Sequence, residues 1–353
     1  MEKNNPIPQT HRTMNRRSFL RLSGMLGLGV ASAGVLPVSA EAVKFNRKTY
    51  KVSKTRLAMG TFVSMTIIHP SRDKAEEAMA LAFDEVSRLT GLMSRFDQAT
   101  GVAQLNREGY IRDLPPEVIE VVEKSLYCYQ LSSGCFDISV KPVVDLFMQK
   151  FGDGKNTPPT NTELAHALTL IGSDKIELKG RNIRFKKPGM GITLDGIAKG
   201  YIVDKASKLL TGHKIENHLI NAGGDIRTVG SKGDKKPWAV AVQDPKKKGH
   251  YPDVIRMTDG AIATSGNYEV YFDREKMFHH IVDPHTGLSP ELSASVSVRA
   301  NTATDADALS TSVFIMDPKK GTGFIDSNPG CECLVVARGG KIFKSAGWKS
   351  ARA

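Results

Sequence analysis

The sequence predicts an α+β fold, built as a single compact unit of mixed sheet and helices. Two long segments show helical periodicity of apolar residues, and short segments rich in β-branched residues recur along the chain. No internal repeat or low-complexity tract is present. A chain of 353 residues with these features is long enough to bury a large core.

Residues 1–40 have the features of an export signal. The pair Arg16-Arg17 precedes an uncharged run from Leu22 to Ala40, which ends in small residues. This arrangement is typical of a removable signal peptide, and the adjacent arginines indicate the twin-arginine route. An uncleaved membrane tether is the alternative, but the run is rich in glycine and only mildly hydrophobic. We therefore expect a periplasmic protein without a permanent membrane anchor.

The chain is basic, with a formal net charge of +12. Six Lys and Arg residues lie between Lys44 and Arg56, within a basic N-terminal segment that spans residues 41–56. Nucleic-acid-binding proteins interleave such bases with aromatic residues or carry them on a recognition helix, and neither pattern occurs here. We therefore expect no nucleic-acid partner and a surface that attracts anionic ligands.

The remaining domain is expected to span residues 57–345. Residues 61–68 favour a strand, and Ser71 is placed to cap a helix. The apolar face of that helix recurs at three- and four-residue spacing and comprises Ala75, Ala78, Met79, Ala82, Phe83, Val86 and Leu89. A second helix is expected to begin at Pro115-Pro116 and to carry Cys128 on its apolar face.

The rest of the chain predicts mainly strands. They are expected at residues 183–185, 218–220, 238–242, 294–298 and 334–337, and Gly339-Gly340 favours a hairpin turn after the last of these. Residues 151–163 are expected to form a polar loop. The four cysteines match no strong zinc-binding spacing, so we assign them no catalytic role.

Several familiar catalytic patterns are absent from the sequence. It contains no GxxxxGK[ST] loop, no HExxH and no GxSxG. Gly189-Met190-Gly191 lacks the third glycine of a dinucleotide fingerprint, which disfavours a Rossmann fold.

Residues 194–201, LDGIAKGY, form the first of four candidate site segments. Asp195 is placed to cap a helix, and exposed N–H groups in the first turn of a helix attract phosphate. Lys199 would add a mobile positive charge. An ordinary capped helix with a solvated lysine explains the same residues.

The second segment, Asn221 to Asp225, follows an apolar stretch directly. Gly223 and Gly224 leave a backbone without Cβ atoms, which can lie against a phosphate or an aromatic ring. A simple turn is the alternative.

The third segment, residues 278–287, contains three histidines. In an extended backbone His279 and His280 point to opposite faces, so they cannot easily share one metal ion. His280, held by the rigid Asp283-Pro284 turn, is predicted to act as a base or a phosphate partner. A structural histidine is the alternative.

The fourth segment, residues 304–311, predicts the start of a helix capped by Thr304 or Asp305. Asp307 and Thr311 are four residues apart, so they share one face of this helix. They can offer a carboxylate and a hydroxyl group to a hard cation such as Mg²⁺. Alternatively, Asp307 only interacts favourably with the helix dipole.

Taken in order, these motifs resemble the ApbE-type family of FAD:protein FMN transferases. The resemblance covers roughly residues 57–320 and includes Met59-Gly60-Thr61 and GCFDIS at residues 134–139. The sequence departs from the family pattern at Asp195, where a glycine pair is common, and at residues 143–147, where the family is richer in aromatic residues.

The resemblance implies that the chain binds FAD with Mg²⁺, transfers FMN to a Thr or Ser hydroxyl of a partner protein and releases AMP. By the motif match, Asp307, Thr311 and the backbone carbonyl of Ala198 would hold the metal. His280 would be the nearest candidate for a general base, and Lys199 would neutralise developing charge.

The remaining matched residues are assigned to cofactor binding by the same resemblance. Met59 and the Gly223-Gly224 turn would flank the flavin or the adenine, and Asp195 and Asp225 lie in the cofactor-binding motifs. The acceptor would belong to a membrane-associated redox complex. Two alternatives stay open: a pyrophosphatase that hydrolyses FAD to FMN and AMP, and a non-catalytic protein that binds or delivers flavin.

Overall fold

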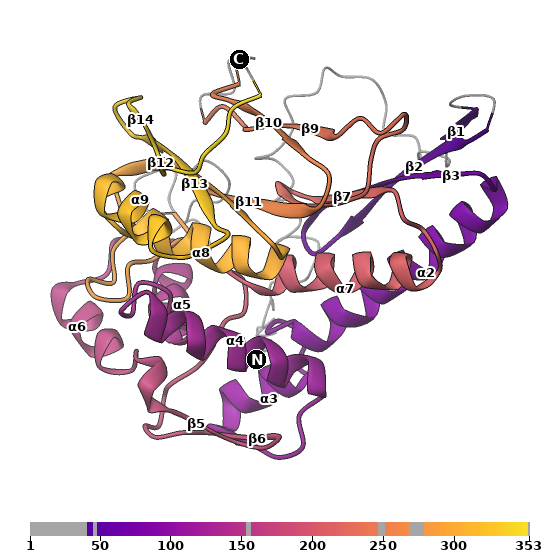
Figure 1. Cartoon of the computed structure of the whole chain (residues 1–353). Helices are drawn as coiled ribbons and strands as arrows, with labels where there is room; N and C mark the ends of the chain where they lie inside the picture. Colours follow the sequence, from indigo (N-terminus) through magenta and orange to yellow (C-terminus); the bar gives the residue numbers. More distant parts are fainter. Residues whose placement is uncertain (1–40, 45–47, 153–156, 246–250, 268–278, 352–353) are drawn as a thin grey trace, which may run out of the picture.

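The computed structural model describes residues 41–44, 48–152, 157–245, 251–267 and 279–351. Within these ranges the central element is a sheet of nine strands in the order β1-β2-β3-β7-β8-β11-β12-β13-β14, and every neighbouring pair is antiparallel (Figure 1). Its strands are β1 (Glu41–Lys44), β2 (Tyr50–Ala58), β3 (Thr61–His69), β7 (His218–Ala222), β8 (Asp225–Val229), β11 (Gly260–Gly266), β12 (Ser293–Ala300), β13 (Glu332–Ala337) and β14 (Ile342–Lys344).

Helices cover one face of this sheet. The α-helices are α2 (Arg72–Met93), α3 (Gly101–Glu108), α4 (Pro116–Leu131), α5 (Lys141–Phe151), α6 (Asn161–Thr169), α7 (Ala198–Gly212), α8 (Ala303–Ile315) and α9 (Pro318–Asp326). Figure 1 shows α2, α7 and α8 along the sheet, with α3 to α6 beyond them. A three-stranded sheet of β4 (Tyr110–Ile111), β6 (Asn182–Phe185) and β5 (Ile176–Lys179) lies on that side as well.

A two-stranded sheet of β9 (Trp238–Ala241) and β10 (Val254–Met257) covers the opposite face (Figure 1). Alternating side chains of β11 therefore enter two different cores: Ala261 and Ala263 pack on the helix side, and Ile262 packs against Val240 and Ile255. An antiparallel sheet with helices gathered on one face is the α+β architecture, so the predicted fold class is confirmed.

The structure bears out most of the predicted elements. Ser71 caps α2 by accepting a hydrogen bond from the Lys74 N–H, and all seven predicted face residues are buried. The helix α4 begins at Pro116, and Cys128 on it is buried. The five predicted strands correspond to β6, β7, β9, β12 and β13, and β13 and β14 form the predicted hairpin.

The predicted polar loop at residues 151–163 is partly wrong. Phe151 ends α5 and Asn161 begins α6, so the connection is shorter than predicted. The reason is a capping box: the Thr160 side chain accepts from the Glu163 N–H, and the Glu163 carboxylate accepts from the Thr160 N–H. This local signal stabilises the start of a helix within a segment that looks only polar.

The start of the described chain belongs to the sheet. Strand β2 pairs with β3 along its whole length, from Tyr50 opposite His69 to Ala58 opposite Thr61. The predicted export signal, residues 1–40, lies outside the described residues. Among the helices that the structure describes, none is both long and apolar enough to cross a membrane.

Asp253 anchors the C-terminal segment to the edge of β10. Its buried carboxylate accepts hydrogen bonds from the side chains of Lys344, Trp348 and Ser350 and from the Val254 N–H. Burial by itself raises the pKa of Asp253, but these hydrogen bonds outweigh burial and lower the pKa to about 2.

We expect Asp253→Asn to make the stability of the protein less dependent on pH. Because the carboxyl group has a lower pKa in the folded protein than the ordinary value near 3.9, it stabilises the fold above pH 4 and loses this effect as the pH falls toward 2. Wild type should exceed the variant by about 2 kcal/mol at pH 6 and by about half as much at pH 3, measured by urea unfolding.

Asp84→Asn is the control, because the Asp84 side chain is 75% exposed and lies 3.8 Å from Arg56. It should change stability by less than about 1 kcal/mol at either pH. An equal loss at pH 6 and pH 3 in Asp253→Asn would contradict this account of the Asp253 carboxylate.

Candidate functional site

The N-terminus of α7 is formed by a tight turn. The N–H groups of Ile197 and Ala198 donate to the Leu194 carbonyl, at 3.1 and 2.8 Å, and no side chain caps the helix. The prediction that Asp195 caps it is therefore wrong. Asp195 lies within this turn, and its carboxylate pairs with Arg95, with 3.2 Å between Oδ2 and Nε. Because the turn delays the helix, Asp195 lies too early in the chain to reach the N–H groups of the first helical turn.

The helix α8 is capped by Thr302. Its side chain accepts a hydrogen bond from the Asp305 N–H at 3.0 Å, so the predicted caps, Thr304 and Asp305, are wrong. Thr304 already lies within the helix, and Asp305 forms an ion pair with Lys124. The helix therefore begins earlier than its sequence predicts.

Asp307 of α8 meets the first turn of α7. Its Oδ2 accepts a hydrogen bond from the Gly200 N–H at 3.0 Å, and the residue is only 6% exposed. At Gly200 an added Cβ would lie 2.2 Å from the Ala303 carbonyl oxygen and 2.9 Å from the Cβ of Asp307. The two helices can therefore approach this closely only because residue 200 is glycine.

Thr311 lies one helical turn after Asp307 on α8 and faces Gly196, just before α7. An added Cβ on Gly196 would lie 3.4 Å from the Thr311 Oγ1, and this hydroxyl is 3.2 Å from the Ser265 Oγ. Ala198 stands in the chain between Gly196 and Gly200. The structure thus places Asp307 and Thr311 against the segment that contains Ala198, and the prediction that Asp307 and Thr311 share one helical face is confirmed.

Lys199 pairs with Asp225 at the start of β8. The Lys199 Nζ lies 3.3 Å from the Asp225 Oδ2, and the Asp225 side chain is almost fully buried. Asp225 follows directly on the Gly223-Gly224 turn, so two of the predicted motifs meet at this ion pair. The carboxylate holds the lysine at the N-terminal end of α7.

Two tight turns lie side by side at this end of the sheet. Gly223 and Gly224 both have positive φ angles, and so do Met59 and Gly60 between β2 and β3. An added Cβ on Gly223 would lie 2.5 Å from the Thr61 Oγ1, because β3 and β7 are neighbouring strands. Met59, assigned by resemblance to the cofactor site, is therefore next to the Gly223-Gly224 turn.

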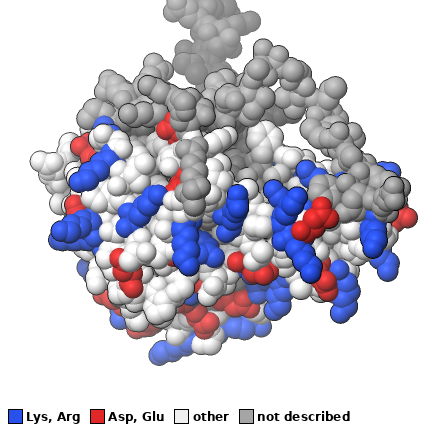
Figure 2. Space-filling view, turned by 45° about the horizontal axis from the view of Figure 1, so that its top comes forward, with Lys and Arg blue, Asp and Glu red and all other residues white. Residues whose placement is uncertain are grey.

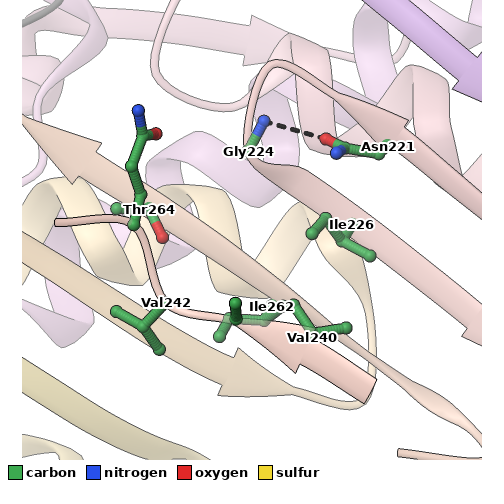
Figure 3. A pocket seen from close by; sticks show the side chains of 9 residues that line it. Asn221, Gly224, Ile226, Val240, Val242, Ile262 and Thr264 are labelled. Carbon is green, nitrogen blue, oxygen red and sulfur yellow. Dashed lines mark hydrogen bonds between the residues drawn. The ribbon is translucent and has the colours of Figure 1, made fainter. Parts of the chain in front are cut away.

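A pocket of about 140 Å³ opens beside the Gly223-Gly224 turn, on the side of the sheet covered by β9 (Figure 3). It is lined by Asn221, Gly224, Ile226, Val240, Ala241, Val242, Gln243, Ile262 and Thr264. Pockets that bury a whole small molecule usually exceed about 300 Å³, so this one can hold only a fragment of a ligand.

The segment 134–139 also reaches the turn before α7. An added Cβ on Gly196 would lie 3.4 Å from the ring of Phe136, and the Thr193 N–H donates to the Ile138 carbonyl at 2.8 Å. Asp137 anchors this segment through hydrogen bonds from Ser139 and Ser173. Burial raises the pKa of Asp137, and these hydrogen bonds oppose that effect.

His279 and His280 differ in their surroundings. His279 is buried, its ring stands edge-on to Phe314 of α8 at 5.6 Å, and its Nε2 lies 3.0 Å from the Pro290 carbonyl oxygen. Burial lowers the pKa of His279 to about 4, so this ring is neutral and structural. His280 is half-buried, as expected if the two rings point to opposite faces. Its catalytic role stays a prediction.

Sequence reasoning missed two residues of this site. Arg95 binds both Asp195 and Asp145, but no spacing in the sequence connects it to residues 50 and 100 positions away. Ser265 contacts Ser310 and Thr311, and the polar end of the apolar strand β11 could have revealed it.

The four cysteines, assigned no catalytic role, are free thiols, and burial raises the pKa of Cys128 to about 12.

Charged side chains are mixed over the visible surface. Figure 2 shows Lys and Arg spread across one face with Asp and Glu among them.

Within the described part of the chain, no group of three or more His, Cys, Asp or Glu is placed to hold a metal. The predicted ligand set needs only one carboxylate, since a hydroxyl and a carbonyl complete it.

The ApbE family matches residues 59–335 of this sequence. The chain belongs to the ApbE family. Among curated relatives, the FAD:protein FMN transferase of Treponema pallidum is 29% identical, over 84% of this chain and 87% of the relative. The FAD:protein FMN transferase of Klebsiella pneumoniae is 28% identical, over 94% of this chain and 96% of the relative.

Solved ApbE structures share the fold. The ApbE protein of Thermotoga maritima is 30% identical with a TM-score of 0.77, covering 84% of this chain and 97% of that chain. The flavin transferase ApbE of Vibrio cholerae is 25% identical with a TM-score of 0.73, covering 84% and 98%. The predicted family and the prediction of an enzyme of this kind are confirmed.

We expect Gly200→Ala to destabilise this ApbE-family protein by about 1–3 kcal/mol, because the new methyl group must displace α8 from α7. Urea unfolding measures the change. Gly212→Ala at the other end of α7 is the matched control, since nothing lies within 4 Å of its added Cβ. It should be neutral or stabilise by up to about 1 kcal/mol. Equal stability of the two variants would contradict the close packing described here.

Proposed function

We propose that this protein transfers FMN from FAD to a Thr or Ser hydroxyl of an acceptor protein and releases AMP. The observation that carries the proposal is the convergence of Asp307, Thr311 and the Gly196–Gly200 turn at the N-terminus of α7. The relatives named above are FAD:protein FMN transferases, which supports flavin transfer as the reaction.

The donor set suits Mg²⁺. Asp307 offers a carboxylate, Thr311 a hydroxyl and Ala198 a backbone carbonyl, and a hard cation that keeps waters and substrate phosphates as further ligands needs few protein oxygens. Asp307 is buried and accepts a hydrogen bond from the Gly200 N–H, so its carboxylate is held at the N-terminus of α7. Bound Mg²⁺ would neutralise charge on the diphosphate of FAD.

The residues of the chain can perform the remaining work. Backbone N–H groups at the start of α7 attract a phosphate group, and Lys199, held by Asp225, adds positive charge. The acceptor hydroxyl oxygen would form a bond to the phosphorus of the FMN half as the bond to the AMP oxygen breaks, and AMP leaves. His280 would take the proton of that hydroxyl.

The chain is proposed to act on the export side of the membrane. The features of residues 1–40 support a twin-arginine signal, and the acceptor would be an exported part of a membrane-associated redox complex. Finding the full-length chain only in the cytoplasmic fraction of expressing cells would contradict this proposal.

Asp307→Ala tests the proposed transfer directly. The purified chain is incubated with FAD, Mg²⁺ and an exported redox protein as acceptor, and then the in-gel flavin fluorescence, the mass of the acceptor and the release of AMP are measured. Wild type should add FMN to the acceptor. The variant should lose transfer by at least about 10²-fold, since it lacks the carboxylate that faces α7.

The same assay separates the alternatives. FMN and AMP that form equally without an acceptor would indicate a pyrophosphatase, and FAD that stays bound and intact would indicate a binding or delivery protein. Thermal unfolding of Asp307→Ala, compared with wild type, shows whether lost activity reflects a lost fold.

His280→Ala should slow transfer by about 10²–10⁴-fold, the range that general base catalysis supplies. The transfer rate of the variant should no longer show the rise with pH that deprotonation of a general base produces. His285→Ala is the control, because His285 is exposed and bound to the carboxylate of Asp283. A pH–rate profile unchanged in His280→Ala would remove this residue from the chemistry.

A further inference from the structure

The N-terminus of α8 is held by a residue from a different helix. Asp204 of α7 accepts hydrogen bonds from the Ala303 N–H at 2.9 Å, the Thr304 N–H at 2.8 Å and the Thr304 hydroxyl at 2.6 Å. The two partners are about 100 residues apart in the chain. The site described above does not use Asp204.

These bonds complete the cap of α8. The first N–H groups of a helix have no partner within the helix. Thr302 satisfies the Asp305 N–H, and Asp204 satisfies the two that precede it. A carboxylate at this end also interacts favourably with the positive end of the helix dipole, by about 0.3–1 kcal/mol or more where it is partly buried.

Arg227 strengthens the same junction from the sheet. Its guanidinium lies 4.0 Å from the Asp204 carboxylate and also donates to the Asn301 carbonyl just before α8. Arg227 belongs to β8. The first residue of this strand is Asp225, which forms the ion pair with Lys199. The junction therefore connects α8, α7 and the sheet.

Asp204 lies one helical turn beyond Gly200, on the side of α7 that faces α8. Gly200 touches Ala303 and Asp307, while Asp204 binds the N–H of Ala303. Two successive contacts along α7 fix both the rotation of α8 and its position along its own axis. Residues 303, 307 and 311 follow at four-residue spacing, so the position of the first sets the positions of the other two.

We infer that Asp204 is a positioning residue for the metal site: it anchors α8 so that Asp307 and Thr311 face the Ala198 carbonyl. The inference rests on the proposed Mg²⁺ site. Groups that orient metal ligands typically change metal affinity by 10–100-fold when they are removed.

The test is Mg²⁺ affinity, measured by calorimetry on the full chain in the presence of FAD and without an acceptor. Asp204→Asn keeps the shape of the side chain but replaces one acceptor oxygen with an N–H donor, which opposes the Thr304 N–H. Its affinity for Mg²⁺ should be about tenfold weaker than that of wild type. In the transfer assay, the Mg²⁺ concentration for half-maximal rate should rise in parallel, while the rate at saturating Mg²⁺ stays close to wild type.

Asp317→Asn is the matched control. Asp317 caps α9 by accepting from the N–H groups of Lys319 and Lys320, so the same Asp-to-Asn change is made at a second helix cap, away from the site. It should leave Mg²⁺ affinity unchanged. Thr304→Val provides a second variant that removes one of the three bonds, and it should weaken Mg²⁺ binding by about threefold.

The outcomes separate the inference from the proposed function. If wild type binds Mg²⁺ and Asp204→Asn binds it equally well, the positioning role is wrong and the metal site stands. If Asp317→Asn weakens binding as much as Asp204→Asn, general loss of stability explains the effect and the positioning role is again wrong. If wild type binds no Mg²⁺, the proposed metal site fails and the inference fails with it. Should Asp204→Asn not fold, unchanged affinity in Thr304→Val would overturn the inference.

Discussion

The close contact between α7 and α8 at Gly200 determines the geometry of the whole site. The Ala303 carbonyl oxygen occupies the space that a side chain at residue 200 would need, so the two backbones meet directly. At that distance the Gly200 N–H reaches the Asp307 carboxylate at 3.0 Å. A bulkier residue would separate the helices and remove this hydrogen bond. The carboxylate is buried, so the contact also supplies the hydrogen bond that a buried charge requires.

The sheet explains how distant parts of the chain gather around this contact. Because neighbouring strands are antiparallel, the β2–β3 turn at Met59-Gly60, the β7–β8 turn at Gly223-Gly224 and the last residues of β11 lie at the same end. Ser265 at the end of β11 reaches Thr311, and Asp225 after the second turn reaches Lys199. Segments separated by more than 200 residues thus lie at the same end of the sheet.

Much of the fold and part of the site could be predicted from the sequence, because the signals are local. Apolar residues at helical spacing predict the buried face of α2, and the spacing of Asp307 and Thr311 predicts their shared face of α8. The errors arise where long-range partners decide. Asp195 binds Arg95 instead of capping α7, and α8 begins early because Thr302 and Asp204 together satisfy its first N–H groups. No local pattern in the sequence reveals that a residue about 100 positions away caps this helix.

We propose that the α7–α8 contact creates a cation site for the diphosphate of FAD. Crystals grown with FAD and Mn²⁺ in place of Mg²⁺ test it most directly, because Mn²⁺ can be located by its anomalous scattering. We expect one anomalous peak bound by the Asp307 carboxylate, the Thr311 hydroxyl and the Ala198 carbonyl, with the FAD diphosphate as a further ligand. A diphosphate bound at another place, or a metal ion that does not contact Asp307, would contradict it.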